Sequence, residues 1–270
     1  MILSTLLMAL AIQTPVDPTA AITTPGNTMK IAPYTMMFSG TTSTDGSSPI
    51  VRWEWDFDDR GATDEGMVMA HRFDSAGTYD VELTVVGGDG HTDTDTIEVV
   101  VSAFSGTTFY VSSSGSDRNN GLSTSRPFKT LSYAESQMNI TTSSGSPNKL
   151  LLKRGDTWTI TGNWGPPSPS IVDAYGGGAK PIIDFPTADD HFSMGAGSAT
   201  SGWGLSRIVN NINITNSSGD RLTDDIVTGT EWGSTLRDCD LEGGGVKVSH
   251  TAGSTPSQHV KLFILEDCTI

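Results

Sequence analysis

Acidic side chains are the residues of this sequence most able to do chemistry, because they occur in adjacent pairs and at a recurring position. An inverting glycoside hydrolase holds two carboxyl groups roughly 6.5–9.5 Å apart, and a polysaccharide lyase adds Ca²⁺ and a basic Lys or Arg. In a chain with 31 acidic residues, an adjacent pair is a weak sign of catalysis. The candidates are Asp189-Asp190, which precede His191, Asp224-Asp225, and the recurring Asp184, Asp238 and Asp267.

A turn role explains Asp238 and Asp267 better than catalysis, since short polar side chains satisfy backbone N–H groups in turns. Arg237, Lys247 and Lys261 lie near these acids along the chain but lack the arrangement that a lyase base needs. We therefore expect no catalytic residue within residues 1–270. Whether a longer protein containing them is an enzyme stays open.

Two further groups of residues invite a ligand. Asp89, Asp93 and Asp95 alternate along GDGHTDTDT, and oxygen ligands of this kind suit Ca²⁺. Alternating Asp and Thr on the solvent face of an edge strand also prevents pairing with other chains, and we favour this interpretation. We expect no cofactor, with Ca²⁺ as the one alternative.

Four tryptophans lie in or beside glycine-rich loops and are able to stack on sugars. Packing against the loop is the more ordinary role of such a ring. Trp158 is one of the four, and the residues that we take as candidate carbohydrate-binding residues are Trp164, Trp203 and Trp232.

Composition excludes one class of partner and favours one compartment. The formal net charge is −15 with only 16 Lys and Arg, and no stretch concentrates the cations that bind several phosphates, so we expect no nucleic-acid partner. The 30 glycines and the plentiful Ser, Thr, Asn and Asp are typical of a β-rich, turn-rich chain outside the cell rather than of a helical enzyme of the cytosol. Two cysteines are too few for a disulfide framework in a chain of this size.

The first dozen residues, MILSTLLMALAI, are apolar but too short to span a bilayer. Ala9-Leu10-Ala11 would suit a signal peptidase, but no Lys or Arg precedes the apolar run. We favour a retained segment, residues 1–14, that docks on another virion or cell-surface protein, over a cleaved signal peptide. No membrane span is expected.

Residues 15–103 show the alternation of apolar and polar residues that is typical of strands in an antiparallel sandwich. Turns such as GGDG at 87–90 separate the runs. The residues expected on the inward face are Val51, Trp53, Trp55, Phe57, Tyr79, Val81, Leu83, Val85, Ile97, Val99 and Val101.

The same segment resembles a polycystic-kidney-disease (PKD) domain, an immunoglobulin-like β-sandwich. That family's pattern is Trp-Asp-Phe-Gly-Asp-Gly, then His-x-Tyr/Phe, then Gly-x-Tyr-x-Val-x-Leu-x-Val. Asp58 and Arg60 replace two of its glycines. The resemblance implies a spacer or adhesive module in which His71 is a packed structural histidine. The matching motif residues are Trp55, Asp56, Phe57, Asp59, His71, Phe73, Gly77 and Tyr79.

Residues 104–149 are expected to form a strand, a long polar turn and a helix. The strand covers residues 109–111, and the turn follows. Ser125 would cap a helix over 127–138 with Pro127 in its first turn. The residues at helical spacing on one face are Phe128, Leu131, Ala134 and Met138.

This opening and the following LLKRGDTW are similar to the start of right-handed parallel β-helix proteins of the pectate-lyase-like superfamily. The resemblance implies a capped parallel β-helix whose coils occupy residues 150–270, and hence an all-β chain. It implies no activity, since the superfamily includes lyases, hydrolases, phage tailspikes and inert adhesins. The matching residues are Tyr110, Val111, Gly115, Asp117, Gly121, Pro127, Phe128, Lys129, Thr130 and Gly155-Asp156-Thr157-Trp158.

A repeated phrase supports stacked coils. VNNINI, LRDCDL and LEDCTI begin at residues 209, 236 and 265, so they recur after 27 and 29 residues. A period of this length is typical of a solenoid, in which equivalent residues stack about 4.8 Å apart. The predicted inner column is Ile212, Cys239 and Cys268, and the predicted turn column is Asn211, Asp238 and Asp267, with Asp184 as a partial match one coil earlier.

We expect Cys239 and Cys268 to be free thiols, since stacked Cβ atoms point the same way. Because LEDCTI ends in mid-coil, we also expect the β-helix to be truncated at its C-terminal end.

These features favour a non-catalytic structural or adhesive surface protein. The most specific form that we expect is a phage fibre, spike or decoration protein that presents both modules to a host surface or glycan. We expect this protein to be a homo-oligomer. Its location would be the virion surface or extracellular space. The alternative is a secreted polysaccharide lyase or glycoside hydrolase with a PKD spacer and catalytic coils beyond residue 270.

Overall fold

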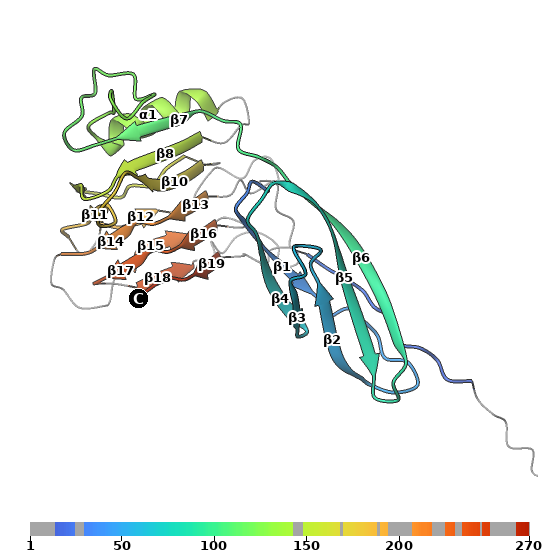
Figure 1. The fold of residues 1–270 in the computed structure, drawn as a ribbon. Helices are drawn as coiled ribbons and strands as arrows, with labels where there is room; N and C mark the ends of the chain where they lie inside the picture. The colour runs from blue at the N-terminus through green and yellow to red at the C-terminus, as the bar shows by residue number, and fades with distance from the viewer. Residues whose placement is uncertain are drawn as a thin grey trace, which may run out of the picture. The chain divides into compact units, whose positions relative to one another are not determined.

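The computed structural model describes residues 14–24, 30–142, 148–167, 170–187, 190–193, 207–217, 225–229, 234–243, 245–248 and 263–269 (Figure 1). The described residues fall into two compact units. The first contains residues up to 24 and 36–101, and the second contains residues 25–35 and 102–270.

The first unit is a β-sandwich, as the alternation predicts. Its larger sheet is antiparallel and has the strand order β3-β2-β5-β6, and β1 pairs with β4 in the other sheet. The strands are β1 (Tyr34–Ser39), β2 (Ile50–Asp56), β3 (Thr63–Glu65), β4 (Val68–Phe73), β5 (Gly77–Gly87) and β6 (Thr92–Val101).

Aromatic rings fill the space between these sheets. The Phe38 ring is fully buried, and its centroid lies 5.8 Å from that of Trp55 and 5.7 Å from that of Phe57. One prediction for the inward face is wrong. Val51 is 64% exposed, because a bulge between Ile50 and Arg52 breaks the alternation at the start of β2.

The second unit is built from three parallel sheets. The first has the order β19-β16-β13-β10-β8-β7, the second β17-β14-β11-β9 and the third β12-β15-β18. The strands of the first sheet are β7 (Thr108–Val111), β8 (Asn148–Lys153), β10 (Ser170–Tyr175), β13 (Arg207–Asn210), β16 (Ser234–Arg237) and β19 (Phe263–Glu266). Those of the second are β9 (Thr157–Thr159), β11 (Ile182–Asp184), β14 (Asn213–Thr215) and β17 (Asp240–Glu242), and those of the third are β12 (Phe192–Ser193), β15 (Asp225–Gly229) and β18 (Gly245–Val248).

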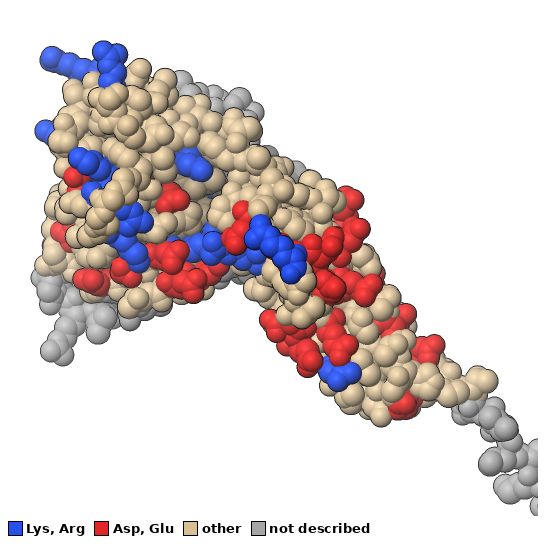
Figure 2. All heavy atoms as spheres, in the orientation of Figure 1, with Lys and Arg blue, Asp and Glu red and all other residues tan. Residues whose placement is uncertain are grey.

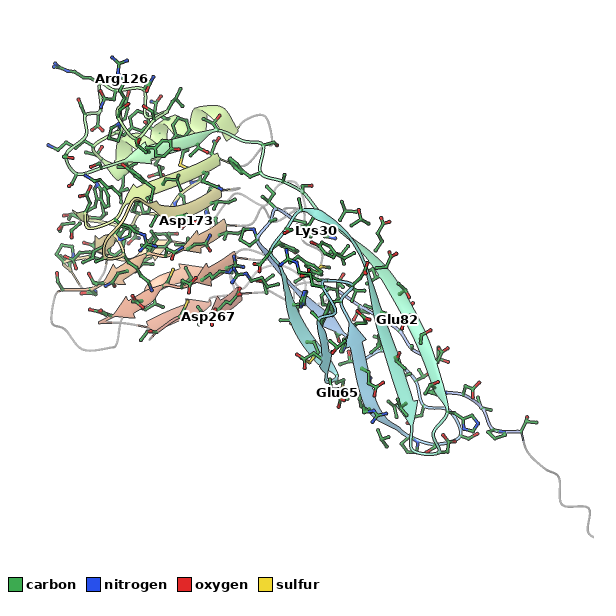
Figure 3. The ribbon with its side chains drawn as sticks, viewed as in Figure 1. Lys30, Glu65, Glu82, Arg126, Asp173 and Asp267 are labelled. Atoms are coloured by element: carbon green, nitrogen blue, oxygen red, sulfur yellow. The ribbon has the colours of Figure 1, made fainter. Side chains whose placement is uncertain are left out.

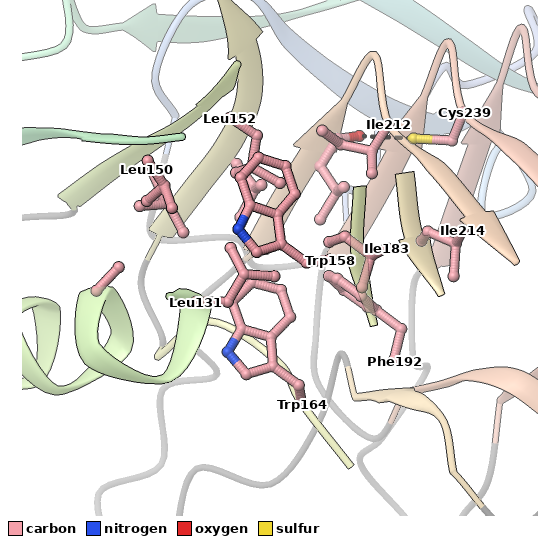
Figure 4. Packing of buried hydrophobic residues seen from close by; sticks show 14 of the residues in the cluster. Leu131, Leu150, Leu152, Trp158, Trp164, Ile183, Phe192, Ile212, Ile214 and Cys239 are labelled. Atoms are coloured by element: carbon pink, nitrogen blue, oxygen red, sulfur yellow. Dashed lines mark hydrogen bonds between the residues drawn. The ribbon is translucent and has the colours of Figure 1, made fainter. Parts of the chain in front are cut away.

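From β10 to β18 the chain visits the three sheets in turn, so that each passage lays one strand on each sheet beside the strand of the passage before. The preceding passage, β8 and β9, places strands on the first two sheets only. We call each passage a coil. The interior between the sheets holds one continuous apolar cluster, from Phe109 to Leu241 (Figure 4). No single coil could enclose this cluster, so the stacking of coils creates the core.

One helix, α1 (Leu131–Thr142), lies at the β7 end of this unit (Figure 1). Its predicted start is wrong by four residues. Phe128 instead forms a bridge to Val111, and the N–H of Phe128 donates to the Tyr110 carbonyl at 2.8 Å. Thr130 rather than Ser125 caps the helix, since its hydroxyl accepts from the N–H of Tyr133 at 3.2 Å.

Candidate functional site

The predicted turn column occupies the corner between the first and second sheets. Asn211, Asp238 and Asp267 each follow a strand of the first sheet, and their φ angles are 58°, 49° and 52°. The N–H of Asn211 donates to the Arg237 carbonyl and that of Asp238 to the Glu266 carbonyl, both at 3.0 Å. Asn and Asp tolerate the left-handed region better than other non-glycine residues. The repeated acids therefore serve a backbone corner.

The predicted inner column lies one residue further along each coil. Ile212 and Cys239 are fully buried, and Cys268 packs against the same cluster. The N–H of Asp240 donates to the Ile212 carbonyl at 3.1 Å, and that of Thr269 to the Cys239 carbonyl at 3.0 Å, so the three positions lie in neighbouring coils.

Cys239 and Cys268 are both free thiols. A hydrogen bond between the two side chains raises the pKa of Cys239 and lowers that of Cys268. Burial adds to the rise at Cys239, which lies in the apolar cluster, whereas Cys268 is only half-buried. The half-buried thiol is thus the more reactive of the two.

Asp184 does not belong to the turn column, which corrects the partial match in the sequence. It lies in β11, in register with Thr159 of β9 and Thr215 of β14. Its carboxylate accepts from the Thr215 hydroxyl at 2.8 Å and from the Ser217 hydroxyl at 2.7 Å. In the earlier coils, glycines such as Gly155 and Gly176, with φ of 82° and 84°, follow the strands of the first sheet.

The adjacent acid pairs are only partly within the described residues. Asp190 is 9% exposed, and its N–H donates to the Thr187 carbonyl at 3.2 Å. Asp189, Asp224 and Lys261 lie outside the described residues, and of Asp225 and Lys247 only the strand backbone is described. The structure therefore describes both side chains of neither adjacent pair.

Trp164 is 3% exposed, and its ring packs edge-on against Phe192 with centroids 5.4 Å apart. Figure 4 shows Trp158 and Trp164 among the buried leucines and isoleucines. Trp158 donates its indole N–H to the Lys129 carbonyl at 3.0 Å. Neither ring presents a face to a sugar, and Trp203 and Trp232 lie outside the described residues.

The aspartates considered for Ca²⁺ have protein partners. The carboxylate of Asp93 accepts from the N–H of Ala20 at 2.9 Å, and that of Asp95 from the N–H of Ile22 at 2.7 Å. Asp89 accepts from the N–H of His91, and this bond lowers the pKa of Asp89. Asp93 and Asp95 thus fasten the segment before β1 to β6, a role that the alternating pattern alone did not reveal.

The PKD motif residues form a connected group at one end of the sandwich. His71 stacks on Phe57 with centroids 4.2 Å apart, and its Nε2 lies 3.1 Å from the Asp59 carboxylate. The Tyr79 hydroxyl donates to the Ser75 carbonyl at 2.8 Å. The indole N–H of the buried Trp55 donates to the Gly66 carbonyl at 2.8 Å. Gly77 packs beside the Tyr79 ring. Each of these contacts joins one part of the domain to another.

The turn between β2 and β3 explains why the family pattern has glycines there. Asp58 and Arg60, which replace them, have φ of 52° and 57°. Both therefore adopt the left-handed region that glycine occupies without strain. Asp56 accepts from the N–H of Asp58 at 3.0 Å, which supports this turn.

The outer face of the larger sheet of the sandwich is acidic. A depression of about 480 Å³ is lined by residues of β2, β3 and β5, including Glu54, Asp56, Glu65 and Glu82 (Figure 3). Within the ranges that the structure describes, no group of three or more His, Cys, Asp or Glu is arranged to hold a metal ion. We therefore interpret this face as a strongly acidic surface and assign no metal site to it. Among the same described residues, no helix has the length and apolarity needed to cross a bilayer.

Comparison with known proteins agrees with the structure of the first unit. The family model of the PKD domain matches residues 16–101. A segment of 89 residues is 38% identical to part of a microbial collagenase of Vibrio alginolyticus, and covers 33% of this chain but only 11% of the collagenase. The PKD1 domain of the Vibrio cholerae metalloprotease PrtV is 27% identical, with a TM-score of 0.29, over 33% of this chain and all of that domain.

A likeness that extends over the second unit is slight. A family 28 exopolygalacturonase of Yersinia enterocolitica has a TM-score of 0.38 and 9% identity, over 85% of this chain and 59% of the enzyme. Similarity at this level carries no argument about activity. The family match supports a PKD domain over residues 16–101, and the sheet topology shows a second unit of stacked parallel strands.

Proposed function

We propose that this chain is a non-catalytic attachment module of the extracellular surface, in which a PKD domain accompanies a right-handed parallel β-helix. The PKD match over residues 16–101 supports an extracellular attachment role, and the microbial collagenase that shares this segment is equally compatible with the enzyme alternative given below. The three parallel sheets visited in turn support the parallel β-helix.

One observation carries the non-catalytic assignment. Three of the acids that the sequence offers for catalysis take part in the fold. Asp238 and Asp267 hold left-handed corners, and Asp184 binds the hydroxyls of the next coil. A carboxylate that accepts from two hydroxyls, as that of Asp184 does, is poorly placed to exchange a proton with a substrate.

A virion fibre, spike or decoration protein is the more specific form of this proposal, with residues 1–14 as its docking segment. It rests on the sequence alone. Mass spectrometry of the N-terminus of the mature protein tests it, because a docking segment must be retained and a signal peptide must be removed.

The alternative is a secreted polysaccharide-active enzyme, in which these residues precede further coils. The slight likeness to the exopolygalacturonase is compatible with it but gives it no support of its own.

Co-sedimentation tests the proposal. Purified protein is mixed with insoluble and cell-surface polysaccharides, and the supernatant is assayed for new reducing ends and for unsaturated uronate. We expect the protein to sediment with at least one polysaccharide and to release no product. Sustained product release would support the enzyme, and absence of sedimentation with every polysaccharide would refute attachment.

A further inference from the structure

A depression of about 710 Å³ lies on the outer face of the first sheet in the second unit, where β7, β8 and β10 meet the polar turn after β7. Tyr110, Lys153 and Tyr175 come from the three strands, and Ser112 and Ser125 come from the turn. The alternation of each strand sends the side chains of Tyr110, Lys153 and Tyr175 outward, since neighbours such as Val111 and Leu152 are buried, whereas Ser112 is itself buried. Sequence reasoning had assigned no role to this surface.

The floor of the depression combines aromatic and hydroxyl groups. The rings of Tyr110 and Tyr175 meet edge to face with centroids 5.3 Å apart. The Ser112 hydroxyl donates to the Asp156 carboxylate at 2.8 Å, which fixes its orientation. Aromatic rings beside oriented hydroxyls are the groups that contact the apolar faces and hydroxyls of a sugar.

The Tyr175 hydroxyl is the one group here whose bonding is incomplete. Its oxygen is buried and has no hydrogen-bond partner within the part of the chain that the structure describes. A buried polar group without a partner is unfavourable, and in native structures such a group calls for an explanation. Burial raises its pKa, with a further contribution from Asp156, so the phenol stays neutral and keeps a proton to donate.

The segment that contains β7 and β8 is basic, whereas the whole chain is acidic. Residues 104–160 contain six Lys and Arg and three Asp and Glu, a net charge of +3 in a protein whose formal net charge is −15. Figure 2 shows Lys and Arg side chains gathered over the first coils of this unit. Lys153 is exposed in the lining and has no ion-pair partner among the described residues. Lys153 is the one charged residue that lines the depression, and its charge favours an anionic ligand.

We propose that this depression, the tyrosine groove (Tyr110, Ser112, Lys153 and Tyr175), binds a saccharide that carries an anionic substituent. Lys153 pairs with the anionic group and the tyrosine rings contact the sugar. A shift of the Tyr175 side chain on binding exposes its buried hydroxyl, which then donates to a sugar oxygen. This inference deepens the proposed attachment function and rests on it. Carboxylated and sulfated sugars share this chemistry, so the experiment includes both.

Binding of the full chain is measured by isothermal titration calorimetry with three soluble oligosaccharides of equal length: a carboxylated oligomannuronate, a sulfated dextran and an uncharged dextran. We expect wild type to bind one or both anionic sugars, more weakly at higher salt, and to bind the uncharged dextran at least tenfold more weakly. Tyr175→Phe removes only the hydroxyl, and Lys153→Gln removes one exposed charge.

Each of these two variants should lose about tenfold in affinity, the equivalent of one hydrogen bond to a charged or well-oriented partner. The matched controls are Tyr133→Phe and Lys129→Gln, which remove the same groups from the same region without lining the groove. These controls should bind within twofold of wild type. Circular dichroism confirms that each variant is folded.

The outcomes separate the site from the function. Wild-type binding that survives both groove variants would overturn the groove and leave attachment standing. Equal affinity for charged and uncharged dextran would overturn the anionic ligand. Failure of wild type to bind any of the sugars would overturn the groove, and failure in the co-sedimentation assay as well would overturn the proposed function.

Discussion

Replacing Asp238 tests whether the repeated phrase encodes a backbone corner or a carboxylate. Asp238 has φ of 49° and follows β16, at the corner between the first and second sheets of the second unit. An L-residue in the left-handed region costs roughly 1–2 kcal/mol, which Asp and Asn reduce by local polar contacts and which glycine avoids. Four substitutions at this one position therefore separate the two explanations.

The expected order of stability follows from the corner. Asp238→Gly and Asp238→Asn should stay within about 0.5 kcal/mol of wild type, because glycine removes the strain but loses more chain entropy on folding. Asp238→Ala should lower the free energy of unfolding by about 1 kcal/mol, and the β-branched Asp238→Val by about 2 kcal/mol.

Urea unfolding of the full chain, followed by tryptophan fluorescence, measures these differences. The matched control is Asp240→Gly, two residues further in β17, where the backbone is extended. Glycine should there lower stability by roughly 0.5–1 kcal/mol, and loss of the partly exposed ion pair with Lys180, at 3.0 Å, should add up to about 1 kcal/mol. If Asp238→Gly is as destabilising as Asp238→Ala, the carboxylate rather than the corner conformation is what the repeat preserves, and our reasoning on the turn column is refuted.

Three other predictions concern single contacts. The Asp117 carboxylate accepts from the N–H groups of Lys129 and Thr130 at 2.8 and 3.0 Å. Burial is the largest single influence on its pKa and raises it, but the hydrogen bonds together outweigh burial and lower the pKa of Asp117 below its usual 3.8. Asp117→Ala should therefore lower the free energy of unfolding by about 1–2 kcal/mol at pH 7. In urea unfolding, this difference between variant and wild type should shrink as the pH falls below about 4 and through the lowered pKa of Asp117. A difference that does not change with pH would contradict this. Arg60→Gly should raise the free energy of unfolding by about 1 kcal/mol, because φ of 57° suits glycine. Thermal unfolding measures this, and a loss of stability would show that contacts of the Arg60 side chain outweigh the relief of backbone strain. Iodoacetamide should modify Cys268 before Cys239, because the pKa of Cys268 is lowered and Cys239 is fully buried. Peptide mass spectrometry measures the order of modification, and the reverse order would contradict the pairing of the two thiols.

The sequence predicted the elements that depend on short-range patterns. Alternation over GTYDVELTVV placed Tyr79, Val81, Leu83 and Val85 inward, and the structure buries all four. The period of 27 and 29 residues identified the stacked coils, because each coil must repeat the same inward residue and the same corner. Patterns of this kind are local consequences of burial and of backbone geometry.

Other features depended on partners that are distant in sequence. The bulge that exposes Val51 is set by the pairing of β2 with β5, and the helix starts at Leu131 because Phe128 pairs with β7. Asp184 looked like a member of the turn column because it lies 27 residues before Asn211, but the register places it beside Thr215. Early coils use glycine at the corner, so counting residues backwards could not find it.

The tyrosine groove was hidden for the same reason. Tyr110, Lys153 and Tyr175 are separated by 43 and 22 positions in the sequence, and only the pairing of β7, β8 and β10 brings them together. A lysine and two tyrosines at irregular spacing give no recognisable motif. The local excess of Lys and Arg in residues 104–160 was the one signal available.

The distance between spin labels at residues 159 and 242 tests the coiled arrangement most directly. Thr159, Asp184, Thr215 and Glu242 are in register on four neighbouring strands, so three strand spacings separate the first from the last. Double electron–electron resonance on Thr159→Cys/Glu242→Cys, with both native cysteines changed to Ser, should give a narrow distribution consistent with a Cα separation of about 14 Å. A broad distribution, or one centred beyond about 30 Å, would mean that residues 83 positions apart do not stack three coils from each other.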